Sequence, residues 1–214
     1  MAIVVFHAGT YTGLTWNAQA DDHGISGWIR HLDVGVTVFF VLSAFLLYRP
    51  FVAAHLRAGP RPDTGSYLVR RITRIFPAYW LALTVGLFVF GYSANLGLWG
   101  RFRLYALIQI YWQDTLLAGL PQAWSLNTEL TFYLFLPVWA AALRHVGRSR
   151  QNVLRAQYVG CVVLYLGALG FRAWLRWDGR HLGYTWLPAH FDAFALGMAM
   201  AVASAAGAAR RSAG

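Results

Sequence analysis

Long apolar stretches alternate with short polar segments along the whole sequence. A helix rises about 1.5 Å per residue, so about 20 apolar residues cross the roughly 30 Å hydrocarbon core of a bilayer. The pattern predicts an all-α fold, a polytopic transmembrane helical bundle of about six spans plus one interfacial or re-entrant segment. We place the spans at residues 1–13, 34–48, 75–100, 124–143, 156–174 and 187–206, within a single domain of residues 1–206 followed by a cytoplasmic tail at 207–214.

The first apolar stretch, residues 1–13, is too short for a complete span, because a helix of that length reaches only about 20 Å. It has no basic region at its start and no small-residue cleavage site, which argues against a signal peptide. We expect a truncated span, or one completed by something else. His7 lies inside this stretch. A lone histidine there is usually a satisfied core residue, but an ionisable group within a span is also a functional candidate.

Residues 104–120 are ambiguous, because an apolar beginning is interrupted by Gln113 and Asp114 and followed by Pro121. If the segment crossed the membrane fully, the arginine-rich loop 144–155 would lie outside the cell. If it formed a re-entrant or interfacial segment, that loop would return to the cytoplasm. The positive-inside rule favours the second interpretation.

A basic segment, Arg70 to Trp80, joins an arginine-rich loop to a long uncharged stretch. At 100° per residue, its apolar side chains fall on one arc, and Arg70, Arg71 and Arg74 occupy a separate arc. This pattern predicts a short helix on the membrane surface, with Pro77 in the first turn of a new helix that enters the bilayer. The arginines are then held at the lipid-water boundary, either as a topology signal and snorkelling anchor or as an anion site.

Composition supports a membrane protein, since 58% of the 214 residues are hydrophobic and only 12% are charged. The net charge of +10 is the difference between 18 basic residues, all of them arginine, and 8 acidic residues. They cluster between apolar stretches as expected for cytoplasmic loops, which argues against nucleic-acid binding. The single cysteine, Cys161, has no partner for a disulfide within the chain, and no spacing of Cys and His predicts a metal site.

Glu129 is the only glutamate in the chain and lies within the predicted span 124–143. A carboxylate at the centre of a span costs about 2.5–3.5 kcal/mol on insertion scales, so we expect it to have a task. Ser125 and Tyr133 lie four residues to either side, on the same helix face, where both hydroxyls can hydrogen-bond the carboxyl group. The alternative is a structural hydrogen bond between helices.

Three motifs resemble the membrane-bound acyltransferase 3 family, which contains sugar and polysaccharide O-acyltransferases. The first is Arg-Arg-x-x-Arg-Ile-x-Pro-x-Tyr, beginning at Arg70. The second, in residues 34–48, departs from the family pattern at Thr37, where Asp is usual, and at Ala44, where Gly is usual and packs helices more closely. The third and most specific is Trp-Ser-Leu-x-x-Glu-x-x-Phe-Tyr-x-x-x-Pro, beginning at Trp124.

The resemblance implies transfer of an acyl group from acyl-CoA to a hydroxyl, with no permanently bound cofactor. His7 matches the family's histidine and is the candidate general base. Arg71 and Arg74, with Arg70 alongside, would hold the CoA phosphates by charge-assisted contacts. Glu129 would orient His7 or hold an acceptor hydroxyl. The supporting candidates are Ser125, Tyr133, His190 and Asp192, of which the last two are either a ligand pair or, as we favour slightly, an interfacial cap.

We therefore expect a multi-pass protein of the plasma (inner) membrane whose partners are acyl-CoA, a carbohydrate or lipid-linked acceptor, and membrane lipids. An inactive truncated remnant is the main alternative, because the family commonly has more spans and its basic residue upstream of the histidine would fall before Met1. A transporter is less favoured, since no inverted repeat is visible.

Overall fold

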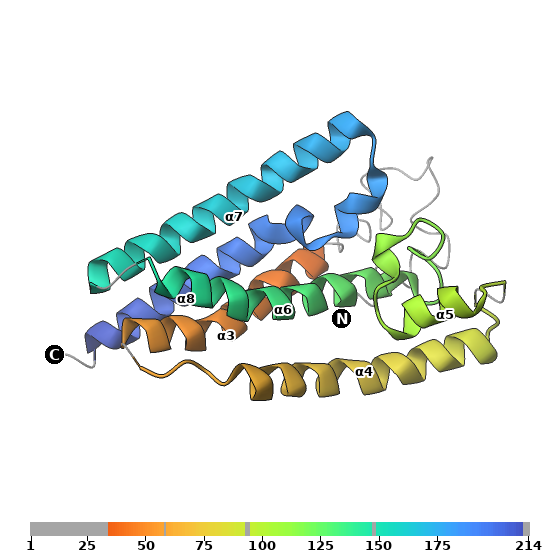
Figure 1. Cartoon of the computed structure of the whole chain (residues 1–214), viewed down its shortest axis with the longest axis horizontal. Helices are drawn as coiled ribbons and strands as arrows, with labels where there is room; N and C mark the ends of the chain where they lie inside the picture. The colour runs from red at the N-terminus through yellow and green to blue at the C-terminus, as the bar shows by residue number, and fades with distance from the viewer. Residues whose placement is uncertain (1–33, 58, 93–94, 147–148, 212–214) are drawn as a thin grey trace, which may run out of the picture.

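The computed structural model describes residues 34–57, 59–92, 95–146 and 149–211, which are mainly helical and contain no strand. Figure 1 shows α7 and α4 on opposite sides of a bundle, with α3, α6 and α8 between them and the short α5 at the end of α4. The helices are α3 (Val34–Leu56), α4 (Thr64–Phe88), α5 (Leu98–Tyr105), α6 (Trp124–Arg144), α7 (Arg150–Asp178) and α8 (Phe191–Arg211), joined in part by the 3-10 turns Gln109–Tyr111, Pro121–Ala123, His181–Thr185 and Leu187–His190.

Four helical segments among the described residues are long and apolar enough to cross a membrane. They correspond to four of the predicted spans and extend past them: Val34–Leu56, Pro121–Arg144, Gln151–Asp178 and Leu187–Ala209. The helix α4, which begins earlier than the predicted span 75–100 and carries three arginines in its first half, is not among the four. The predicted span 1–13 lies outside the described residues.

The expected break before Pro77 is wrong, because α4 is one helix of 25 residues with this proline in its interior. Proline removes one backbone hydrogen bond and disfavours the helix interior, but neighbouring segments can hold such a helix together. Beyond the proline, the Tyr79 hydroxyl donates to the Leu104 carbonyl at 2.6 Å and Trp80 Nε1 donates to the Tyr105 carbonyl at 2.9 Å. In the same way α3 continues through Pro50, where we expected the span to end.

The main core lies where α3, α6 and α8 meet. The rings of Phe40, Phe132 and Phe194, one from each helix, stack with centroids 4.7 Å apart for Phe40 and Phe194 and 4.0 Å apart for Phe132 and Phe194. The helices α3 and α8 approach closely at Gly197, where an added Cβ would overlap the Val41 carbonyl oxygen. Ala44, which replaces the family's usual glycine, is fully buried at this contact. Close packing of α3 against α8 is therefore retained, because Gly197 on α8 supplies the small residue at this contact.

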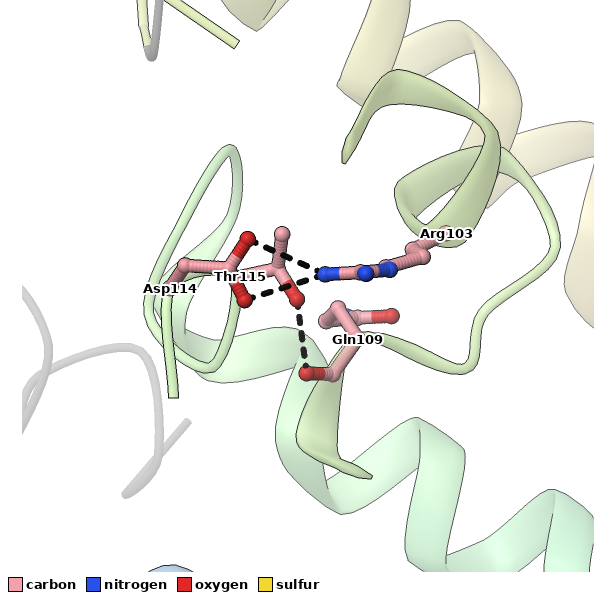
Figure 2. Close-up of polar contacts among 4 residues, drawn as sticks. All are labelled: Arg103, Gln109, Asp114 and Thr115. Atoms are coloured by element: carbon pink, nitrogen blue, oxygen red, sulfur yellow. Dashed lines mark hydrogen bonds and ion pairs between the residues drawn. The ribbon is translucent and has the colours of Figure 1, made fainter. Parts of the chain in front are cut away.

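Residues 104–120 do not form a crossing helix, since after α5 they contain only turns and one 3-10 segment. The folded segment is fastened by Arg103, whose Nη1 donates to both carboxylate oxygens of Asp114 at 3.0 Å. Figure 2 shows this pair together with the Thr115 hydroxyl, which donates to the Gln109 backbone carbonyl at 3.1 Å. The path of the backbone therefore agrees with the re-entrant or interfacial interpretation.

Candidate functional site

A cavity of about 830 Å³ lies between α3, α4 and α6 and brings together several residues that the sequence analysis selected. Apolar side chains form most of its wall, and its polar side chains come from all three helices. The polar lining residues are Ser43, Arg71, Arg74, Tyr79, Gln122, Glu129 and Tyr133. A mostly apolar pocket with a few convergent polar groups is the usual form of a ligand site.

Glu129 lies on α6 with only 4% of its surface exposed. The Ser43 hydroxyl of α3 donates a hydrogen bond of 2.7 Å to Glu129 Oε1. Tyr133, one turn further along α6, lies beside this carboxyl group and interacts with it. Tyr133 therefore lies on the same side of α6 as Glu129, whereas the Ser125 hydroxyl donates to the Gln122 carbonyl at 3.1 Å.

The three arginines of α4 do not share one environment. Arg71 is half-buried and Arg74 exposed, and both line the cavity, where they interact electrostatically with Glu129. The guanidinium carbon of Arg71 lies 5.9 Å from the centroid of the Tyr133 ring. Its Nε is buried and has no hydrogen-bond partner among the described residues. Arg70 is exposed and does not line the cavity.

Two further residues belong to this region and were missed as candidates. Ser43 lies in the middle of an apolar stretch, and its place in the second motif was the available signal. Tyr67 stands one turn before Arg71 on α4 and is 7% exposed, with Arg71 and Glu129 in its surroundings. Its hydroxyl is buried without a hydrogen-bond partner among the described residues. Spacing of four residues from Arg71 was the only sequence signal for Tyr67.

His190 and Asp192 lie elsewhere, because neither lines the cavity. The His190 ring stacks on Trp124 at 5.4 Å and meets the edge of Phe40 at 5.3 Å. Asp192 forms an ion pair of 2.8 Å with Arg172 of α7. These contacts agree with a packing role for the pair. His7, the candidate base, lies outside the described residues.

The cavity can hold a molecule that combines an apolar part with oxygen atoms that accept hydrogen bonds. Arg71 and Arg74 supply positive charge and planar donor groups, which suit anionic or strongly polarised oxygens. Glu129 supplies an acceptor that Ser43 and Tyr133 hold in place. No group of three His, Cys, Asp or Glu residues suited to a metal ion occurs among the described residues.

Comparison with known proteins identifies one family. The family model for an acyltransferase domain, acyltransferase 3, matches residues 1–209 of the 214. No curated protein and no solved structure matched the chain. The match covers all of the described helices except the last two residues of α8.

Proposed function

We propose that this chain transfers an acyl group from acyl-CoA to a hydroxyl. The chain belongs to the acyltransferase 3 family, is therefore an acyltransferase, and has helices long and apolar enough to cross a membrane. The acceptor in this proposal is a sugar or another component of the cell envelope, and the protein works in the plasma membrane. One observation carries the proposal. Arg71, Arg74 and Glu129, drawn from two separate motifs, line one cavity within the bundle.

The proposed reaction joins the acceptor oxygen to the acyl carbonyl carbon and breaks the bond from that carbon to the CoA sulfur. A general base takes the proton of the acceptor hydroxyl, and this proton ends on the departing thiol. His7 is the proposed base, by its match to the family's histidine. Glu129 holds the acceptor hydroxyl or orients His7, and Arg71 and Arg74 bind the acyl donor.

The buried position of Glu129 fits this role. Its carboxyl group accepts a hydrogen bond from Ser43, has Tyr133 beside it, and lies within electrostatic range of both cavity arginines. A carboxylate held by fixed donors in a partly apolar cavity is preorganised, so little reorganisation is needed when a substrate hydroxyl or imidazole approaches. Such an arrangement favours a functional carboxylate over one that only joins helices.

The test is acyl transfer by the full chain in membranes, comparing wild type with Glu129→Gln for several acyl-CoA donors and hydroxyl acceptors. Glutamine keeps the shape of the side chain but removes its charge, so transfer should fall by about a hundredfold or more, the scale of lost acid-base assistance. Thermal stability should remain close to wild type. Tyr158→Phe, on the exposed face of α7, is the control and should transfer at the wild-type rate.

Two results would contradict the proposal. Acyl transfer by Glu129→Gln at the wild-type rate would show that Glu129 has only a structural role. If the folded wild-type chain transferred no acyl group from any acyl-CoA donor, the proposed reaction itself would be contradicted.

A further inference from the structure

A second cavity, of about 360 Å³, also lies between α3, α4 and α6, near the C-terminal end of α6. Among the residues that the structure describes, its polar lining consists of Arg61, Thr64 and Arg144 and includes no acidic side chain. The rest of its wall is apolar: Phe51, Pro62, Pro137, Val138, Ala140 and Ala141. Two guanidinium groups and a hydroxyl above an apolar wall suit a ligand that carries phosphate groups on an organic chain.

The two arginines are placed together by the fold. Arg144 lies in the last turn of α6, and its Nη2 donates to the Gly59 carbonyl at 3.0 Å, which fastens the loop before α4 to the end of α6. Arg61 follows two residues later in that loop and stays exposed. The nearby Asp63 carboxylate is engaged as the cap of α4, accepting from the amides of Gly65 and Ser66.

The second cavity lies one helical turn beyond the first on both α3 and α6. On α3, Leu47 lines the first cavity and Phe51, one turn later, lines the second. On α6, Tyr133 and Pro137 are related in the same way. The Tyr67 ring forms T-shaped contacts with the rings of Phe51 and Tyr133, with centroids 5.6 Å and 6.5 Å apart, respectively. The two cavities thus follow one another along α3 and α6, and Tyr67 packs against a lining residue of each.

The rise of α4 between a lining residue of the second cavity and one of the first is of the same order as the length of the CoA arm. From Thr64 to Arg71 the helix rises about 10 Å, and Arg61 lies beyond its start. The arm of CoA between its diphosphate and its sulfur contains two amide groups and, like four residues of extended peptide, spans about 14 Å. If the phosphates lay at Arg71 and Arg74, an extended arm would carry the thioester well away from Glu129. If the thioester lies beside Glu129, the phosphates reach the second cavity.

We propose that the phosphate groups of the acyl donor bind at Arg61 and Arg144, with its arm passing Tyr67 and its thioester lying in the cavity of Arg71 and Glu129. This inference rests on the proposed acyl transfer and adds a binding site to it. It also assigns Arg71 to the acyl end of the donor. There we assign the Nε of Arg71 and the hydroxyl of Tyr67, two buried donors with no hydrogen-bond partner among the described residues, to the thioester carbonyl oxygen.

The test compares two donors, acyl-CoA and the corresponding S-acyl-pantetheine, which keeps the arm and the thioester but lacks every phosphate. Arg61→Ala and Arg144→Ala should each raise KM for acyl-CoA by about tenfold or more, the effect of losing a hydrogen bond to a charged group, and should leave kcat unchanged. With S-acyl-pantetheine the same variants should behave as wild type. Arg57→Ala, an exposed arginine outside both cavities, is the matched control for net charge.

Arg61 and Arg144 variants that keep the wild-type KM for acyl-CoA, while wild type transfers normally, would overturn this inference and leave the proposed function intact. An equal loss with both donors would also overturn it, because the arginines would then not act through phosphate. Absence of transfer from either donor by folded wild type would instead contradict the proposed function.

Discussion

The Ser43 hydroxyl donates a hydrogen bond of 2.7 Å to the Glu129 carboxylate, joining α3 to α6 across 86 residues of sequence. Both side chains are buried, with 9% and 4% of their surfaces exposed. Because Tyr133 approaches the same carboxyl group from its own helix, the carboxylate is held from two directions at the cavity wall. Helix packing and site geometry therefore depend on the same contact.

The first prediction concerns this contact. Ser43→Ala removes a hydrogen bond between membrane helices, for which coupling energies average about 0.6 kcal/mol and reach about 1.7 kcal/mol. A double-mutant cycle of Ser43→Ala with Glu129→Ala, measured as free energy of unfolding in detergent, should give a coupling in this range. Ser125→Ala, whose hydroxyl bonds a backbone carbonyl, should show no coupling to Glu129. A zero coupling for Ser43 would show that the hydrogen bond adds nothing to stability.

The second prediction separates the three arginines of α4. Arg71→Ala and Arg74→Ala should weaken binding of acyl-CoA, because both side chains line the first cavity. Arg70→Ala should have a smaller effect than either, since Arg70 is exposed outside it. Binding to the purified protein in detergent, with Arg57→Ala as a charge-matched control, measures the difference. Equal losses for all four variants would mean that only net charge matters.

The third prediction tests the contact of α3 with α8. A Cβ at Gly197 would overlap the Val41 carbonyl oxygen and lie 2.8 Å from the Ala44 Cβ. Gly197→Ala should therefore lower the free energy of unfolding by about 1–3 kcal/mol, the typical cost of overpacking. Gly207→Ala, in the same helix but with open space around the added methyl, should be neutral or stabilising by up to about 1 kcal/mol. Similar thermal stabilities of the two variants would contradict this packing.

The fourth prediction concerns the fold of residues 104–120. Arg103 donates to both oxygens of Asp114 and lies 4.4 Å from the centroid of the Trp112 ring, which lysine cannot reproduce in the same geometry. Arg103→Lys should speed amide hydrogen exchange in this segment by about tenfold or more, the scale of a lost charge-assisted hydrogen bond. Exchange within α8 should stay unchanged. Arg101→Lys, on the same short helix, is the control, and equal exchange in both variants would exclude a role for the ion pair.

Local pattern in the sequence was sufficient for the helices and for part of the site. The apolar stretches predicted α3, α6, α7 and α8, because burying backbone polar groups in a bilayer requires long helices. Spacing by four residues placed Glu129 and Tyr133 on one helix face, and the structure keeps them together. These properties depend only on residues a turn or two apart.

Tertiary structure decided what depends on contacts between helices. The partner of Glu129 is Ser43 from α3, not Ser125 from its own helix, because the choice follows from how α3 and α6 pack. The helix α4 continues through Pro77 because contacts from Tyr79 and Trp80 to the segment after α5 hold it on the far side of the proline. His190 lies apart from the cavity for the same kind of reason, since its ring packs against Trp124 and Phe40. Periodicity along one helix determines which face a residue occupies, and only the packing of several helices determines what that face meets.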